Sequence, residues 1–121
     1  MTDIDRDELV GRLDDETLTI LDVRSEEEYA GELGARCDPR QGRIAGALHL
    51  DLQELMELTA AEIEERLGAP AGAEVVTYCH SGSRSALAVQ ILSAAGYDAR
   101  NYVGSWHEWS RDDSLPSESG R

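Results

Sequence analysis

The sequence contains no lysine and no phenylalanine, and all 11 of its basic residues are arginine. Set against 25 aspartate and glutamate residues, these arginines leave a formal net charge of −14 at pH 7. A nucleic acid backbone or an anionic membrane surface binds proteins through clustered positive charge. The charge balance therefore argues against both as partners.

Long hydrophobic runs and paired cysteines are also missing. No apolar stretch approaches the ~20 residues that a membrane-spanning helix needs, and residues 1–5 lack the basic and apolar regions of a signal peptide. We therefore expect a cytoplasmic protein in which Cys37 and Cys79 are free thiols rather than a disulfide. The 2 cysteines and 3 histidines show no spacing typical of metal ligands, so the sequence predicts no metal site.

The chain of 121 residues, 40% of them hydrophobic, is long enough for one globular domain with a buried core. Strand-like and helix-like segments alternate up to residue 110 without an internal repeat or a linker. From Arg111 onward the sequence is polar and includes Pro116. The sequence thus predicts one domain over residues 1–110 and a disordered tail over residues 111–121.

The alternation of these segments indicates an α/β fold. Expected strands cover residues 17–23, 47–50, 74–78 and 99–103. Expected helices cover residues 5–13, 51–58, 59–67 and 85–95, with short helical turns after Ser25 and Gly104. Strands separated by helices predict a parallel sheet with helices on both faces. Ligands of such sheets bind beyond the carboxyl ends of the strands.

Cys79 stands at one of these ends, between a predicted strand and a predicted helix. The unpaired N–H groups that open a helix point back toward such a residue and carry roughly half a positive charge. Gly82 allows a tight turn, and Arg84 adds a full charge. Together these features favour a nucleophilic thiolate and form a cradle for an anion. The alternative is an inert thiol buried at a strand end.

Four segments in this order resemble the motifs of single-domain rhodaneses, the sulfurtransferase family. They are Leu21–Arg24 followed by Glu28 and Tyr29, Gly42–Ala47, Cys79–Ala86, and Gly104–Trp109. The resemblance extends over residues 4–110 and is specific because all four occur in sequence, whereas any one alone would be weak. It departs from the family at Arg43 and Ala45, where histidine and proline are usual. The resemblance implies a rhodanese-like fold, with a five-stranded parallel sheet flanked by helices.

The resemblance also implies an activity, that of a thiosulfate sulfurtransferase. The Cys79 thiolate would take a sulfane sulfur from thiosulfate or another persulfide donor and pass it to a thiol or to cyanide, with a protein as a further candidate acceptor. No metal or organic cofactor is implied. The substrate-binding residues would be the rest of the loop: His80, Ser81, Gly82, Ser83 and Arg84. The alternative is a sulfur-carrying or protein-binding module that turns over little free thiosulfate.

The length of the loop separates this interpretation from a competing one. Phosphatases and arsenate reductases of related fold use a Cys-x5-Arg loop, which is sized for a tetrahedral oxyanion. Here Cys79 and Arg84 give Cys-x4-Arg, and Ser85 occupies the position that would complete the longer loop. The smaller cradle fits one sulfur atom better than a phosphoryl group, which disfavours a phosphatase.

A long connection over residues 31–41 carries Arg36, Cys37 and Arg40. One hypothesis is that these residues bind an anionic donor, or that Cys37 receives sulfur from Cys79. The simpler interpretation is a solvent-exposed insertion with an idle thiol, because connections in such folds usually have only 2–6 residues.

Other polar and aromatic residues are expected to have structural roles. Asp22 and Arg24 should form ion pairs with neighbours, such as Arg24 with Glu28, and fix the loop after the strand. Trp106 and Trp109 should form a hydrophobic lid over the last turn.

Overall fold

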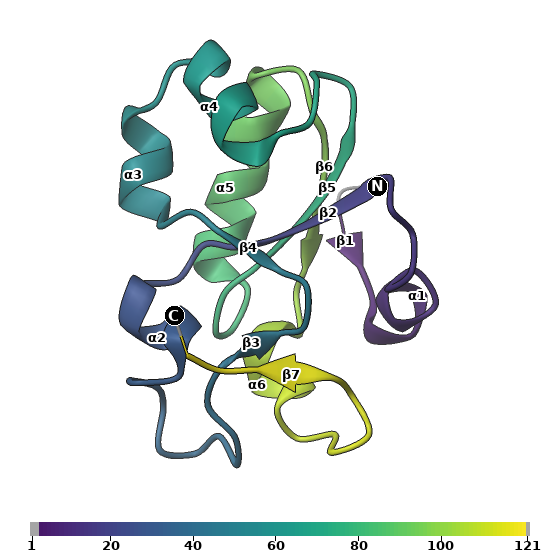
Figure 1. The fold of residues 1–121 in the computed structure, drawn as a ribbon, viewed down its shortest axis with the longest axis vertical. Helices are drawn as coiled ribbons and strands as arrows, with labels where there is room; N and C mark the ends of the chain where they lie inside the picture. The colour runs from purple at the N-terminus through teal and green to yellow at the C-terminus, as the bar shows by residue number, and fades with distance from the viewer. Residues whose placement is uncertain (1–2, 121) are drawn as a thin grey trace.

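The computed structural model describes residues 3–120, and within this range five parallel strands form the main sheet (Figure 1). In spatial order they are β1 (Asp3–Ile4), β6 (Asp98–Tyr102), β5 (Glu74–Tyr78), β2 (Leu18–Asp22) and β4 (Leu48–His49). The predicted α/β fold with a five-stranded parallel sheet is confirmed. The two-residue strand β1 has no counterpart among the predicted strands.

Strand β5 is the centre of the sheet and matches the strand predicted over residues 74–78. It pairs with β2 along its whole length, from Glu74 opposite Leu18 to Tyr78 opposite Asp22. Its other edge pairs with β6. The last four residues of β5 are fully buried, as expected for a strand covered on both faces.

Helices cover both faces of this sheet, as predicted. Figure 1 shows α3 (Leu52–Glu57), α4 (Ala60–Leu67) and α5 (Ser83–Ala94) on one side and α1 (Arg6–Val10) on the other. Leu92 of α5 packs with Val75 in the core on the first side. Leu9 of α1 packs with Val76 in the core on the second side, where α6 (Ser105–Trp109) also lies. Neighbouring residues of β5 therefore point into different cores.

Residues 31–41 form the long connection that the sequence predicts between α2 (Glu26–Ala30) and the strands that follow; we call it the insert. Its Arg40 is the most heavily bonded residue of the insert. The guanidinium donates hydrogen bonds of 2.9–3.1 Å to the backbone carbonyls of four residues after β6: Trp109, Ser110, Asp112 and Leu115. Arg40 therefore fixes the path of the C-terminal segment, and its contacts do not support the hypothesis that it binds an anionic donor.

Residues 111–120 make specific contacts, although the sequence predicts a disordered tail there. Strand β7 (Ser117–Glu118) pairs antiparallel with β3 (Arg43–Ile44). Leu115 is buried, and the Trp109 indole N–H donates to the carbonyl of Pro116 at 3.0 Å. Although this segment is mostly polar, Leu115 is buried in the core, and backbone groups of the segment bond to residues far away in the sequence.

Among residues 3–120, none of the helices combines the length and the apolar character that crossing a bilayer requires.

Candidate active site

The candidate active site is the turn between β5 and α5, residues 79–84, which we call the Cys79 loop. Helix α5 begins at Ser83, two residues earlier than predicted, so its first turn lies directly behind the thiol. Gly82 precedes the helix with φ +97°, a left-handed conformation. A Cβ atom at this position would lie 2.8 Å from the carbonyl oxygen of Val103. Only glycine fits both the dihedral angle and the available space.

The Cys79 side chain lies inside this turn and is 0% exposed. The Gly82 N–H donates to Sγ at 3.1 Å, and the Ser85 hydroxyl lies 3.4 Å from the same atom. Burial raises the pKa of the thiol, but hydrogen bonds from the Ser85 hydroxyl and from the N–H groups of Ser85, Gly82 and Ser81 outweigh it. The net pKa of Cys79 therefore lies below its ordinary value, which favours the thiolate.

The start of α6 holds the Cys79 loop from the other side. The Ser105 hydroxyl accepts from the Cys79 N–H at 3.1 Å and donates to the Tyr102 carbonyl at 2.8 Å. The N–H groups of Trp106 and His107 donate to the carbonyls of Cys79 and His80, both at 2.9 Å. Ser105 has φ +54°, a conformation that costs a non-glycine residue about 1–3 kcal/mol. The surrounding hydrogen bonds hold it there, so the turn is rigidly placed.

The side chains of the loop diverge from the thiol. Ser81 and Ser83 are exposed, and His80 lies against the insert. Arg84 forms a bidentate ion pair with Glu28 of α2, at 2.9 and 3.2 Å, so its charge is partly compensated. The atoms within hydrogen-bond reach of the sulfur are therefore backbone N–H groups and the Ser85 hydroxyl, a residue that sequence reasoning considered only for loop length.

The pairing of Glu28 with Arg84 corrects the expected pair of Glu28 with Arg24. Burial alone would raise the pKa of Glu28, but the Arg84 guanidinium and hydrogen bonds from Ser25 lower it to about 2. Glu28 also closes the capping box with Ser25 at the start of α2, as predicted. One carboxylate thus joins α2 to the Cys79 loop.

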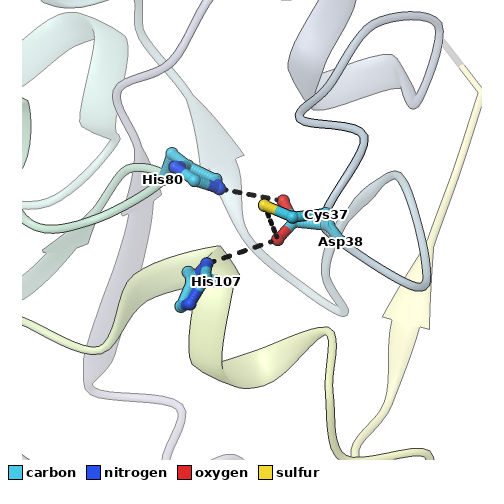
Figure 2. Close-up of side chains that lie close together, drawn as sticks. All are labelled: Cys37, Asp38, His80 and His107. Atoms are coloured by element: carbon cyan, nitrogen blue, oxygen red, sulfur yellow. Dashed lines mark hydrogen bonds and ion pairs between the residues drawn. The ribbon is translucent and has the colours of Figure 1, made fainter.

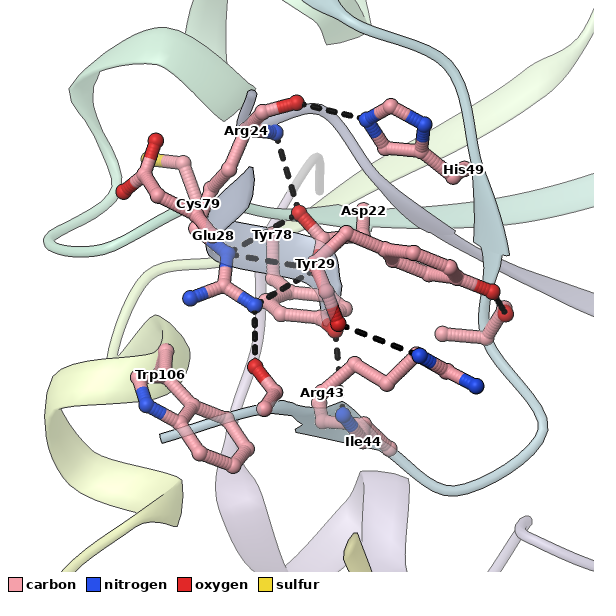
Figure 3. A network of polar contacts seen from close by, with 12 residues as sticks. Asp22, Arg24, Glu28, Tyr29, Arg43, Ile44, His49, Tyr78, Cys79 and Trp106 are labelled. Atoms are coloured by element: carbon pink, nitrogen blue, oxygen red, sulfur yellow. Dashed lines mark hydrogen bonds and ion pairs between the residues drawn. The ribbon is translucent and has the colours of Figure 1, made fainter. Parts of the chain in front are cut away.

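Arg24 pairs instead with Asp22, at the end of β2, in a site where both side chains are almost fully buried (Figure 3). The ion pair measures 2.7 Å, and a second guanidinium N–H reaches the Gly42 carbonyl. The guanidinium also lies 5.3 Å from the ring of Trp106. This network supports the structural role predicted for Asp22 and Arg24. Trp106 itself is fully buried, so it belongs to the core rather than to a lid.

The geometry can be compared with known proteins. The family model for the rhodanese-like domain matches residues 5–112. The chain belongs to the rhodanese family. A relative from Azotobacter vinelandii, named thiosulfate sulfurtransferase, is 37% identical over 93% of this chain and 44% of its own length. A putative mitochondrial thiosulfate sulfurtransferase from Schizosaccharomyces pombe is 34% identical over 79% of this chain and 66% of its own.

Solved structures show the same rhodanese fold. A crystal structure described as a probable thiosulfate sulfurtransferase matches with a TM-score of 0.82 and 42% identity, covering 97% of this chain and 47% of the other. The anaerobic ergothioneine biosynthesis enzyme from Chlorobium limicola matches with a TM-score of 0.87 at 24% identity, which shows a shared fold alone. This rhodanese-like chain spans less than half the length of its Azotobacter relative and of the first of these structures.

Proposed function

We propose that this rhodanese-like chain is a thiosulfate sulfurtransferase that carries sulfane sulfur on Cys79. The proposal rests on the groups that surround Sγ of Cys79. The Gly82 N–H lies at 3.1 Å and the Ser85 hydroxyl at 3.4 Å, both at the start of a twelve-residue helix. These donors stabilise negative charge on sulfur. The names of the relatives at 37% and 34% identity support the same activity.

In the first half-reaction, the Cys79 thiolate attacks the outer sulfur of thiosulfate. A new S–S bond forms to Sγ, the original S–S bond breaks, and sulfite leaves with the bonding electron pair. The product is a Cys79 persulfide, whose terminal sulfur can take over the negative charge. The N–H groups of the Cys79 loop supply donors for that charge, because they point into the turn and have fixed positions.

In the second half-reaction, a thiolate or cyanide attacks the outer sulfur of the persulfide. The S–S bond to Sγ breaks, Cys79 leaves as a thiolate, and the acceptor becomes a persulfide or thiocyanate. The donors that lower the pKa of Cys79 make it a good leaving group here. Because the first product leaves before the acceptor reacts, the mechanism is ping-pong. Neither step calls for a metal or an organic cofactor.

The remaining loop residues are proposed to bind the donor. His80, Ser81, Ser83 and Arg84 surround the turn, and the exposed hydroxyls of Ser81 and Ser83 can bond the sulfonate oxygens of thiosulfate. Arg84 adds positive charge near the thiol even while it pairs with Glu28. We also place the activity in the cytoplasm, where a reducing environment keeps the thiols free.

A second candidate is a sulfur-carrying module that receives sulfur from a protein or small-molecule persulfide and turns over little free thiosulfate. The net charge of −14 favours this candidate, because it repels a dianionic donor at long range. Both candidates use the persulfide on Cys79. They differ in the donor and in the rate of turnover.

Mass spectrometry of the intact protein after incubation with thiosulfate tests the proposal. The expected result is a gain of about 32 Da, one sulfur atom, that is removed by cyanide and absent from Cys79→Ser. Cys37→Ser is the matched control and should load normally. Steady-state thiocyanate formation then separates a turning-over enzyme from a carrier. A folded wild-type protein that gains no sulfur from thiosulfate or from a persulfide donor would refute both candidates.

A further inference from the structure

Four side chains that could bind a metal ion meet beside the Cys79 loop (Figure 2). Cys37 and Asp38 come from the insert, His80 from the Cys79 loop and His107 from α6. One potential ligand atom of each lies within 4.8 Å of the other three. Sequence spacing did not indicate this cluster, because its members come from three segments that only the fold brings together.

The Asp38 carboxylate is the centre of the cluster. Its Oδ2 lies 3.0 Å from His80 Nε2, and its Oδ1 lies 3.5 Å from His107 Nδ1 and 3.8 Å from Cys37 Sγ. A tetrahedral zinc ion with bonds of about 2.0–2.3 Å holds its ligand atoms roughly 3.3–3.5 Å apart. The distances to Asp38 are close to that spacing, so small side-chain rotations are enough to form the site.

Two atoms of the cluster are buried without a hydrogen bond. Asp38 Oδ2 and His80 Nε2 lie 3.0 Å apart, yet each lacks a hydrogen-bond partner in the described structure. The Asp38 side chain is 0% exposed. Buried polar atoms are nearly always hydrogen-bonded, so an ion pair that includes no hydrogen bond leaves both atoms available to a cation. A cation between them would satisfy both.

The surroundings of the cluster hold these ligands in place. Arg111 donates to Asp38 Oδ1 at 2.9 Å and to the Cys37 carbonyl at 2.7 Å. A hydrogen bond to one carboxylate oxygen orients the other, as commonly happens for carboxylates that bind metal ions. The guanidinium also balances the charge of Asp38 when no cation is bound. The backbone N–H of His107 donates to the His80 carbonyl at 2.9 Å, which places the backbone of α6 beside the Cys79 loop.

We propose that Cys37, Asp38, His80 and His107 form a zinc-binding site. Two imidazoles, one thiolate and one carboxylate are the donor types that zinc takes in tetrahedral sites, whereas calcium and magnesium prefer oxygen ligands alone. Binding forms an S–Zn bond and releases the thiol proton of Cys37 to solvent, with no change of oxidation state. The thiolate and the carboxylate each contribute one negative charge toward the charge of the ion.

A metal site would give the insert a function, whereas an exposed and unreactive Cys37 would give it none. The site would connect the insert to His80, the residue next to Cys79, and to the start of α6. The proposal does not rest on sulfur transfer, because none of its ligands is the reactive thiol.

Cobalt and zinc titrations of the reduced 121-residue chain test the proposal. Bound to a thiolate in a tetrahedral site, Co²⁺ gives a thiolate-to-metal charge-transfer band in the near ultraviolet and strong visible bands. We expect both, with one metal ion per chain, and displacement of cobalt by zinc. Competition with a chromophoric chelator gives the zinc affinity.

Four variants decide which residues bind. Cys37→Ser should lose the charge-transfer band, and His107→Ala should weaken zinc binding by about 10-fold or more. Cys79→Ser should keep the band, and His49→Ala, which changes the histidine on β4 outside the cluster, should keep the affinity. Circular dichroism confirms that each variant is folded. The proposal is wrong if wild-type protein shows no thiolate band, if the band persists in Cys37→Ser, or if it disappears with Cys79→Ser instead.

Discussion

The Ser85 hydroxyl offers the sharpest test of how the Cys79 thiolate is stabilised. It is the one side-chain group within hydrogen-bond distance of the sulfur in the described structure, at 3.4 Å, and Ser85 is fully buried; toward a thiolate the hydroxyl is the donor. Replacing Ser85 with alanine removes this donor and leaves the Gly82 N–H in place. Because the hydroxyl stabilises the charged form of the thiol, its removal should raise the pKa of Cys79.

The expected size of this change follows from the strength of the hydrogen bond between the Ser85 hydroxyl and the Cys79 thiolate. Hydrogen bonds to charged groups contribute about 1.5–3 kcal/mol, and a long bond to sulfur belongs at the lower end of that range. Ser85→Ala should therefore raise the pKa of Cys79, and a free-energy loss of about 1.4 kcal/mol corresponds to a tenfold change in the equilibrium between thiol and thiolate. Wherever the pH lies below both pKa values, the thiolate fraction and the loading rate should fall about tenfold. Well above both, the two proteins should load at similar rates.

The assay is the ultraviolet absorbance of the thiolate as a function of pH, measured in a Cys37→Ser background so that Cys79 is the only thiol. Tyrosine ionisation should not overlap, because burial raises the pKa of all 4 tyrosines above its usual value. Ser83→Ala is the matched control, since Ser83 is exposed on the first turn of the same helix. An unchanged or lower pKa in Ser85→Ala would show that backbone N–H groups alone hold the thiolate.

Three further predictions concern the frame of the site. Gly82→Ala should lower the free energy of unfolding, measured by urea denaturation, by about 1–2 kcal/mol or more, and it should abolish sulfur loading. Alanine disfavours φ +97°, and its Cβ would crowd the Val103 carbonyl. A variant as stable as the wild type would contradict this prediction. Glu28→Gln should lower stability at neutral pH, since the folded pKa of Glu28, about 2, lies below its ordinary value of 4.5. The difference in the free energy of unfolding between Glu28→Gln and the wild type should be largest above pH 4.5 and should shrink as the pH falls toward 2. A difference that does not change with pH would exclude the ion pair with Arg84 as its cause. Leu115→Ala should cost about 2–4 kcal/mol if the C-terminal segment is part of the fold, and almost nothing if it is a free tail.

The sequence predicts four of the five strands of the main sheet and the place of Cys79 because these depend on local patterns. Strand β5 and helix α5 are long apolar segments, and the turn between them carries its own glycine and cysteine. The two-residue strands β1, β3 and β7 were not predicted, because each is defined by a partner far away in the chain; β4 is equally short but lies within the strand expected over residues 47–50.

The parts of the site that sequence reasoning missed are those made by distant residues. Ser105 accepts from the Cys79 N–H only because its backbone adopts φ +54°, and no local pattern predicts that angle. The sequence suggested Arg24 as the partner of Glu28, whereas the observed partner, Arg84, depends on how α2 packs against the Cys79 loop. The cluster around Asp38 likewise exists only in the folded chain.

Arg40 makes the insert and the C-terminal segment interdependent. Its single guanidinium satisfies four carbonyl groups of residues 109–115, and its own carbonyl accepts from the indole of Trp106. Deleting the insert would take a guanidinium donor from each of these carbonyls. Truncating the chain after α6 would leave the partly buried Arg40 with the carbonyl of Trp109 as the one remaining acceptor of the four. Engineering or evolution can therefore shorten either segment only by changing the other, and a rhodanese-like chain that lacks one of the two should be expected to lack its counterpart.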